Sequence, residues 1–323
     1  MKSSDFYLDL IEGYISQIEL PSEPENLYAP IRYSISGGGK RIRPLLLMLT
    51  HSLFDDNYSE ALPAAAAIEV FHTFTLLHDD IMDNAPIRRG KASVHAQWGS
   101  NVAILSGDVM MINAYKLLSQ VQPQYIGQAL EVFNNMASEV CEGQQYDMDF
   151  ETRPKVSVAE YMTMIELKTS VLLGGAAYIG ALLGGATIEQ CKTLQKIGTV
   201  LGLAFQLQDD LLDSYGDEQL GKAIGGDILE GKQTFLMITA MSRADEPTRE
   251  ILRNTHRDES LSNKEKIARI KEVYDKLDIV HLTKQQIKTK FDRALAMLDS
   301  LNIDEGKLFT LKEFAQSLIN RRK

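Results

Sequence analysis

Hydrophobic residues recur along the chain at intervals of three and four, which is the spacing of one face of an α-helix. No sustained alternation of polar and apolar residues, bounded by hairpin turns, suggests a sheet. The pattern predicts helices over residues 6–17, 28–36, 40–49, 60–83, 102–118, 125–150, 158–183, 188–215, 232–242, 246–254, 264–275, 283–301 and 311–322. No linker or low-complexity tract divides them. The sequence therefore predicts an all-α protein with one domain over residues 1–323.

The composition is that of an ordinary globular protein, with 44% hydrophobic and 24% charged residues among 323. The 34 basic and 44 acidic residues give a formal net charge of -10, the wrong sign for nucleic-acid binding. The N-terminus has no basic region followed by an apolar one, so we expect no signal peptide. Cys141 and Cys191 form no CxxC pattern and indicate neither a disulfide framework nor a zinc site. These features favour a cytoplasmic protein without nucleic-acid partners.

The longest apolar run covers residues 171–186, which is shorter than the ~20 residues of a membrane-spanning helix. Within it, Gly180 and Gly184 have the spacing of one helical face. We therefore expect close helix–helix packing inside the core and no stable membrane insertion.

Two aspartate clusters carry the clearest chemical signal, and each has the pattern DDxxD at the end of a predicted helix. Their members are Asp79, Asp80, Asp83, Asp209, Asp210 and Asp213. The first and last carboxylates of each cluster lie one turn apart on one helical face, where they repel each other next to the negative end of the helix dipole. Carboxylate oxygens suit Mg²⁺, which commonly bridges a few carboxylates and a substrate phosphate. A solvated acidic helix end is the alternative for either cluster alone, but finding the pattern twice predicts a metal-bridged diphosphate site.

A basic turn follows the glycine run 37–39. Lys40 and Arg43 stand near the start of a predicted helix, where cations oppose the helix dipole. A basic helix start without a ligand is the alternative, but the opposed dipole favours an anionic partner.

These motifs together resemble the trans-isoprenyl (polyprenyl) diphosphate synthases, the family of the short-chain farnesyl and geranylgeranyl diphosphate synthases. The resemblance covers most of the chain and rests, in the family's order, on GGKRIRP (38–44), His72, DDIMD (79–83), RRG (88–90), Lys168-Thr169, QLQDDLLD (206–213) and the GK pairs at 221–222 and 231–232. It implies the isoprenoid-synthase fold, a single large bundle of antiparallel helices around a central cavity. It also implies a prenyltransferase: an allylic diphosphate (dimethylallyl, geranyl or farnesyl) loses pyrophosphate, and isopentenyl diphosphate attacks the cation head to tail.

The resemblance assigns roles to individual residues. About three Mg²⁺ ions, for which Mn²⁺ can substitute, are implied per active site, on Asp79, Asp83 and Asp209, with the other cluster aspartates in support. The isopentenyl diphosphate site is assigned to Lys40, Arg43, His72 and Arg89. The allylic diphosphate site is assigned to Arg88, Lys168, Thr169, Gln206, Lys222 and Lys232.

Some of these assignments have plain alternatives. A lone lysine is most often a solvated charge, and a lone histidine such as His72 is more often a core residue than a ligand. Thr169 and Gln206 match positions whose oxygens face the cationic carbon. The tail 321–323 resembles a basic segment that closes over the isopentenyl site in some members, although a frayed charged end is the simpler interpretation.

Three other functions compete with this interpretation. A terpene cyclase shares the fold, but its second metal site normally contains Asn and Ser or Thr, whereas residues 209–213 keep the synthase form. A P-loop NTPase would use residues 216–222, which match GxxxxGK, but Ala223 stands where the motif needs Ser or Thr. A non-catalytic partner subunit would be expected to lack a cluster aspartate, and none is missing.

Product length is expected to depend on the helical turn before the first cluster. Thr75 lies about 40° from Asp79 on the helix and Phe74 about 140°. By resemblance, aromatics at both positions stop the product at C15, whereas one aromatic at the earlier position is typical of C20 enzymes. We therefore expect geranylgeranyl diphosphate (C20) in preference to farnesyl diphosphate (C15). Met110 and Met111 are further candidates for the side chains that close the end of the product cavity, or they are ordinary core residues.

The resemblance also implies a homodimer.

Overall fold

The computed structural model describes residues 2–216 and 224–319. The chain folds into two compact units, which are described separately. Unit 1 comprises Met1–Asn134, Gly174–Lys196 and Leu301–Lys312, and unit 2 comprises Asn135–Leu173, Ile197–Ser300 and Glu313–Lys323. The single-domain organisation of residues 1–323 stays a prediction.

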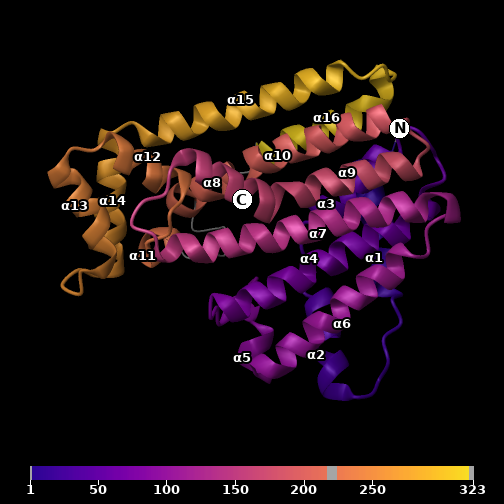
Figure 1. Cartoon of the computed structure of the whole chain (residues 1–323), viewed down its shortest axis with the longest axis horizontal. Helices are drawn as coiled ribbons and strands as arrows, with labels where there is room; N and C mark the ends of the chain where they lie inside the picture. The colour runs from indigo at the N-terminus through magenta and orange to yellow at the C-terminus, as the bar shows by residue number, and fades with distance from the viewer. Residues whose placement is uncertain (1, 217–223, 320–323) are drawn as a thin grey trace. The chain divides into compact units, whose positions relative to one another are not determined.

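Almost all of the described secondary structure is helical (Figure 1), so the all-α prediction is confirmed. Unit 1 contains α1 (Ser4–Ser16), α2 (Glu25–Ile35), α3 (Ile42–His51), η1 (Tyr58–Glu60), α4 (Leu62–Met82), β1 (Ile87–Arg88), β2 (Lys91–Ala92), α5 (Val94–Trp98) and α6 (Ser100–Leu118). Unit 2 contains α8 (Val158–Ile165), η2 (Glu166–Ser170), α11 (Gly226–Glu230), α12 (Phe235–Arg243), α13 (Glu246–Asn254), η4 (Thr255–Arg257), α14 (Asn263–Lys276) and α15 (Ile279–Asp299). Residues of both units form α7 (Pro123–Thr152), α9 (Val171–Leu183), α10 (Ile188–Tyr215) and α16 (Glu305–Ile319).

The structure departs from the predicted elements in three ways. The stretch 158–183, predicted as one helix, is divided into α8 and α9 by η2, a π-helical turn. The five-residue helices α5 and α11 were not predicted, because they are too short for a periodic pattern to develop. The two-residue strands β1 and β2 were likewise too short to show alternation.

The core of unit 1 is built on α4, which packs against α3 and α6. A side chain at Gly180 of α9 would place its Cβ 2.1 Å from the carbonyl oxygen of Leu47, and one at Gly184 would lie 2.7 Å from that of His51. The expected close packing through these two glycines is therefore confirmed, and the neighbouring helix is α3.

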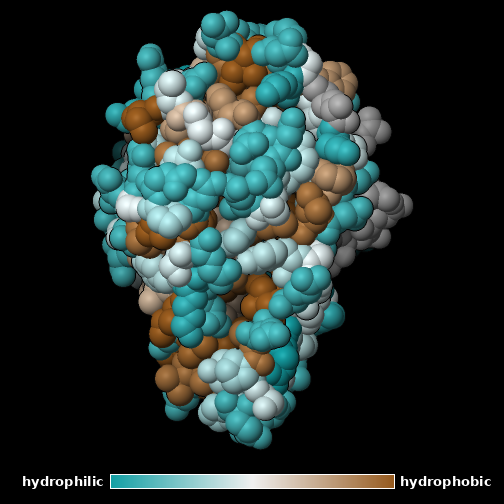
Figure 2. Space-filling view, turned by 90° about the vertical axis from the view of Figure 1, so that its right-hand side faces the viewer, coloured by the Kyte–Doolittle hydropathy of each residue, from teal (hydrophilic) through white to brown (hydrophobic). Residues whose placement is uncertain are grey.

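Two helical stretches, Tyr58–Met82 and Val158–Leu183, are long and apolar enough to cross a membrane, but 67% and 72% of their apolar windows are buried inside the fold. Such burial is what core helices show. On the face drawn in Figure 2, hydrophilic residues predominate and hydrophobic residues form separate patches between them.

In unit 2, α14 packs against α11, α13 and α15 (Figure 1). Tyr274 of α14 and Leu252 of α13 belong to the buried cluster that also includes Leu207 and Leu211 of α10. The C-terminal part of α10, which carries the second aspartate cluster, is thus anchored in the core of this unit.

Candidate active site

The first aspartate cluster lies at the C-terminal end of α4, where its members face different ways. Asp80 is 4% exposed and accepts a hydrogen bond from Nε of Arg88 at 2.8 Å. Nη2 of Arg88 also donates to Oδ2 of Asp79 at 3.2 Å. Burial raises the pKa of Asp80, and the hydrogen bond from Arg88 opposes that rise. Asp79 and Asp83 are more exposed than Asp80 and are the members that can reach a ligand.

The RRG motif forms the loop of the β1–β2 hairpin. Arg88 pairs with Lys91, and the two residues between them, Arg89 and Gly90, have φ angles of 53° and 75°. Positive φ at both central positions is the type I′ turn, whose twist matches that of the strands. The turn directs two successive arginines to different partners, because Nη1 of Arg89 donates to the carbonyl oxygen of Gly38 while Arg88 holds the aspartates.

The basic set predicted for isopentenyl diphosphate gathers in unit 1. Nη1 of Arg43 lies 3.0 Å from Nε2 of His72. Burial, followed by the charges of Arg43 and Arg89, holds the pKa of His72 well below its usual value, so the neutral ring accepts this hydrogen bond. Burial also lowers the pKa of Arg43 to about 10. Lys40 is exposed in the glycine-rich turn that Arg89 contacts.

A buried ion pair behind this set escaped the sequence reasoning. Arg41 has a left-handed backbone conformation (φ 46°) and donates from Nη1 to Oε1 of Glu69 at 2.6 Å. It also donates from Nε to Oε1 of Glu12 at 2.8 Å and from Nη2 to the carbonyl oxygen of Ile35 at 3.1 Å. Arg41 thereby ties α1, the glycine turn and α4 together. Glu69 in the apolar stretch 64–71 was the available signal, because a buried charge requires a partner.

The second aspartate cluster, at the end of α10 in unit 2, has the same inward-facing middle residue. Asp210 is 4% exposed. Its Oδ1 accepts from Nε2 of Gln206 at 3.0 Å, and its Oδ2 accepts from the backbone N–H of Phe235 at 3.4 Å and from the hydroxyl of Tyr161. Burial raises the pKa of Asp210 to about 6 in spite of these donors. Asp209 and Asp213 are more exposed.

Asp227, in α11, is a further carboxylate beside this cluster that the sequence reasoning missed. Its backbone N–H donates to Oδ2 of Asp213 at 3.0 Å. Burial raises the pKa of Asp227 to about 8, and the nearby charges of Asp213 and Asp210 push it in the same direction. Carboxylate oxygens suit a hard divalent cation. In the described part of the chain, however, no three potential ligands gather closely enough to hold a metal ion, so the Mg²⁺ expected from the DDxxD pattern stays a prediction.

The Lys168-Thr169 pair lies on the π-helical turn η2. Nζ of Lys168 donates to Oδ2 of Asp147 at 2.6 Å, and Oγ1 of Thr169 donates to Oε1 of Gln206 at 3.2 Å. Thr169, Gln206 and Asp210 are thus linked in one chain of hydrogen bonds. π-helical turns occur frequently at functional sites, and here the turn brings the two predicted residues to α10 and α7.

Two further lysines, Lys222 and Lys232, are predicted to bind the allylic diphosphate, and the structure describes the second of them. Nζ of Lys232 pairs with Glu230 at 3.0 Å, and the backbone N–H of Lys232 donates to the carbonyl oxygen of Asp227 at 2.9 Å. Lys222, most of the GxxxxGK segment and the basic tail 321–323 lie outside the described residues.

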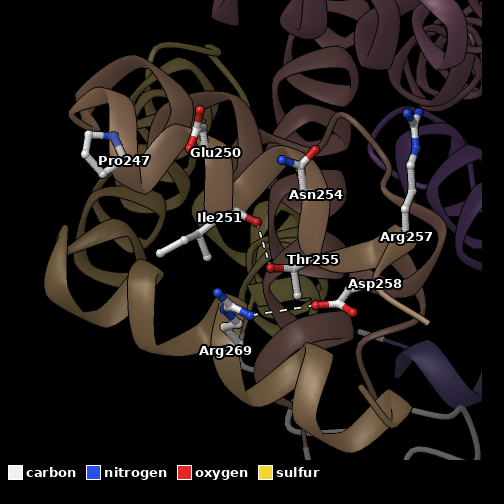
Figure 3. A pocket seen from close by; sticks show the side chains of 8 residues that line it. All are labelled: Pro247, Glu250, Ile251, Asn254, Thr255, Arg257, Asp258 and Arg269. Carbon is white, nitrogen blue, oxygen red and sulfur yellow. Dashed lines mark hydrogen bonds and ion pairs between the residues drawn. The ribbon is translucent and has the colours of Figure 1, made fainter. Parts of the chain in front are cut away.

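A cavity of about 470 Å³ lies between α13, η4 and α14 (Figure 3), lined by Pro247, Glu250, Ile251, Asn254, Thr255, Arg257, Asp258 and Arg269. Figure 3 shows Arg269 paired with Asp258, at 4.0 Å. None of the predicted site residues lines it. One wall of this cavity, η4, contacts the chain next to Lys232. The ring of its His256 lies against Gly231, where an added Cβ would come within 2.8 Å of that ring.

In the helical turn before the first aspartate cluster, the side chains of Phe74 and Thr75 lie in different surroundings. Phe74 is buried, with its ring 5.5 Å from that of Phe71 and 4.8 Å from that of His78. Thr75 is partly exposed and donates to the carbonyl oxygen of His72 at 2.8 Å. Met110 is fully buried. Phe74 therefore lies in an aromatic row on a different helical face from Asp79.

Comparisons with known proteins show which proteins this chain is similar to. Residues 24–277 match the family model of the polyprenyl synthetases. The geranylgeranyl diphosphate synthase of Methanosarcina mazei is 45% identical over 236 residues, covering 72% of this chain and 73% of that one. The geranylgeranyl diphosphate synthase of Sulfolobus acidocaldarius is 37% identical over 323 residues, covering 98% and 95%. The geranylfarnesyl diphosphate synthase of Aeropyrum pernix is 38% identical over 243 residues, covering 73% and 76%.

A crystal structure of a geranylgeranyl pyrophosphate synthase superimposes with a TM-score of 0.92 at 38% identity, covering all of both chains. The family match, the curated relatives and the structural likeness show that the protein is a prenyltransferase with the isoprenoid-synthase fold. The chain belongs to the polyprenyl synthetase family. This membership favours the synthase over the terpene cyclase and the P-loop NTPase as the class of the protein.

Proposed function

We propose that the protein condenses isopentenyl diphosphate head to tail with an allylic diphosphate, in the presence of Mg²⁺, to give geranylgeranyl diphosphate. The observation that carries the proposal lies within unit 1. Arg88 donates to the carboxylates of Asp79 and Asp80, while the next residue, Arg89, donates to the carbonyl oxygen of Gly38 in the glycine turn that precedes Arg43, the partner of His72. One site is thus built for an anion with metal ions and the neighbouring one for an anion held by the protein's own cations.

The acidic and basic sites suit the two substrates for different reasons. The allylic diphosphate must leave, and Mg²⁺ held by Asp79, Asp83 and Asp209 would neutralise its developing charge as a Lewis acid. Isopentenyl diphosphate must keep its diphosphate. Arg43 and Arg89 offer guanidinium forks and Lys40 a point charge, with the neutral ring of His72 orienting Arg43.

In unit 2, we assign Lys168, Lys222 and Lys232 to the oxygens of the allylic diphosphate. Thr169 and Gln206 present neutral oxygens to the allylic carbon, where a free carboxylate would capture the cation. Asp210 and Asp80, both buried and held by protein donors, are positioning residues in this proposal rather than metal ligands. Asp213 and Asp227 support the ion assigned to Asp209.

The product assignment follows from Phe74 and Thr75. The single aromatic at the earlier position, together with relatives named geranylgeranyl diphosphate synthases, supports C20 as the main product. A relative named geranylfarnesyl diphosphate synthase shares a similar percentage of its sequence with this chain, so a C25 product is the second candidate.

Assembly and location complete the proposal. Ile104, Leu105 and Ile112 of α6 are large apolar side chains that are 43%, 58% and 49% exposed, as expected of a surface that a second copy covers. We therefore assign a homodimer, which sedimentation of the purified protein measures, and for the location we keep the cytoplasm expected from the sequence.

The activity test compares two aspartate variants. Purified wild-type protein is given isopentenyl and farnesyl diphosphates with Mg²⁺, with Mn²⁺ or with a chelator. Asp79→Ala should abolish condensation, whereas Asp9→Ala, at an exposed aspartate on α1, should leave it unchanged. Condensation at the wild-type rate by the Asp79→Ala protein would contradict the proposal, as would full activity in the chelator.

A further inference from the structure

The chain of hydrogen bonds that ends at Thr169 begins at a residue with no assigned role. Tyr161 of α8 is 2% exposed, and its hydroxyl donates to Oδ2 of Asp210. Asp210 in turn accepts from Gln206, and Gln206 accepts from Thr169. These contacts lie within unit 2 and connect α8, α10 and η2.

The direction of each hydrogen bond in this chain is fixed by the chemistry of its members. An ionised carboxylate can only accept, so Gln206 must turn its Nε2 toward Asp210. Its Oε1 then faces Thr169, whose hydroxyl hydrogen is used in donating to it at 3.2 Å. The part of Thr169 that remains for a substrate is therefore an oxygen lone pair.

The opposite arrangement of the same side chains would present a hydrogen. A Gln206 amide turned by half a rotation would offer Nε2 to Thr169, whose oxygen would have to accept. The Thr169 hydroxyl hydrogen would then point elsewhere, and a positive carbon nearby would meet a positive dipole end. The orientation of the Gln206 amide thus decides the sign of the dipole that Thr169 shows.

We infer that Tyr161 is a positioning residue that sets this orientation: by holding Asp210, it makes Thr169 and Gln206 present oxygen lone pairs to the allylic cation. The inference rests on the proposed function. Without the Tyr161 hydroxyl, the remaining donor to Oδ2 of Asp210 among the described residues is the backbone N–H of Phe235, at 3.4 Å. A carboxylate that loses its strongest donor can rotate, and the amide of Gln206 loses its fixed acceptor.

The test uses Tyr161→Phe, which deletes one oxygen and keeps the ring. The matched control is Tyr178→Phe: Tyr178 of α9 is 5% exposed, accepts from Nε2 of Gln128 at 2.7 Å and has no place in the site. Single-turnover condensation should be about tenfold slower in Tyr161→Phe, with the KM for isopentenyl diphosphate unchanged, while Tyr178→Phe keeps the wild-type rate. Equal rates for the two variants would overturn the inference.

A binding measurement separates dipole orientation from a merely structural loss. The probes are a prenyl ammonium compound with pyrophosphate and Mg²⁺, which mimics the cation, and an unreactive prenyl thiodiphosphate, which does not. Tyr161→Phe should weaken binding of the ammonium compound about tenfold and leave binding of the thiodiphosphate unchanged. An equal loss for both probes, which poor folding would also produce, would overturn the inference.

A double-mutant cycle shows whether Tyr161 acts through Gln206. In a Gln206→Met background, Tyr161→Phe should have no further effect on the single-turnover rate, whereas additive effects would contradict the inference. Failure of the proposed function is distinguishable from these outcomes, because wild-type protein would then form no prenyl product at all.

Discussion

A β-carbon added at Gly143 of α7 would lie 2.1 Å from the backbone nitrogen of Lys168. The missing side chain lets α7 pack directly against η2, the π-helical turn that carries Lys168 and Thr169. It also lets Asp147, one turn further along α7, accept from Lys168 at 2.6 Å.

Gly143→Ala should therefore displace η2 and lower the condensation rate about 100-fold, the cost of a misplacement near 1 Å. Gly127→Ala is the matched control on the same helix, because a β-carbon there meets nothing within 4 Å. The control should keep full activity and raise the free energy of unfolding by about 0.5–1 kcal/mol. Steady-state kinetics and denaturant unfolding measure both effects, and equal activity of the two variants would show that the contact does not matter.

The sequence predicted the long helices well because an amphipathic face leaves a periodic pattern over several turns. It also predicted which residues gather around His72, since the DDxxD, basic and RRG motifs are short local signals. The π-helical turn at Lys168 was missed because it changes the helix locally without interrupting the apolar pattern.

The supporting residues were harder to foresee. Arg41 pairs with Glu69 and Tyr161 with Asp210 across 28 and 49 residues of sequence, and a long-range pair leaves no local pattern. The same holds for Asp227, whose proximity to Asp213 depends on how the chain returns after α10. Local patterns thus predicted the residues that we propose to touch the substrates, and only the fold revealed the residues that hold those side chains in place.

The buried ion pair of Arg41 gives a prediction about stability. Arg41 contacts two glutamates, whose side chains are 4% exposed for Glu69 and 50% for Glu12. Removing one partner of a buried pair leaves an uncompensated charge and costs about 3 kcal/mol, whereas an exposed pair contributes less than about 1 kcal/mol.

Glu69→Gln should accordingly lower the free energy of unfolding by about 3 kcal/mol, and Glu12→Gln by much less. Both variants remove one charge from the same arginine and keep the size of the side chain. Urea unfolding followed by circular dichroism measures the difference. Equal losses would mean that burial of Glu69 does not determine the strength of the pair.

His51 makes stability depend on pH. It is fully buried, Nδ1 and Nε2 have no hydrogen-bond partner among the described residues, and burial lowers its pKa. The unfolded chain binds a proton near pH 6.5, while the folded chain binds it only at lower pH. The contribution of His51 to the free energy of unfolding therefore falls as the pH drops below about 6.5, by up to about 1.4 kcal/mol per pH unit.

His51→Leu should flatten part of this slope without loss of stability at pH 7.5, because no hydrogen bond is broken. His72 and His256, whose pKa values are also lowered by burial, keep their contributions to the slope, and Asp210 and Asp227, whose pKa values are raised, act in the opposite direction. His281→Gln, an exposed histidine on α15, serves as the control and should retain the wild-type slope. Unfolding curves between pH 5 and 8 measure the slopes, and an unchanged slope in His51→Leu would refute the assignment.

The two residues before the first cluster should change product length in opposite directions. Phe74→Ala removes the aromatic ring beside His78 and should lengthen the main product beyond C20. Thr75→Phe places a ring on the face of Asp79 and should shorten it to C15. Chromatography of the dephosphorylated products gives the product lengths. An unchanged length distribution in both variants would show that this helical turn does not limit the length of the product.

The most direct test of the account is the product of the wild-type protein. Purified protein is incubated with labelled isopentenyl diphosphate, Mg²⁺ and, in separate reactions, dimethylallyl, geranyl or farnesyl diphosphate. We expect elongation of all three starters, with geranylgeranyl diphosphate as the main product each time. Absence of any prenyl product, or a main product of C30 or longer, would contradict it.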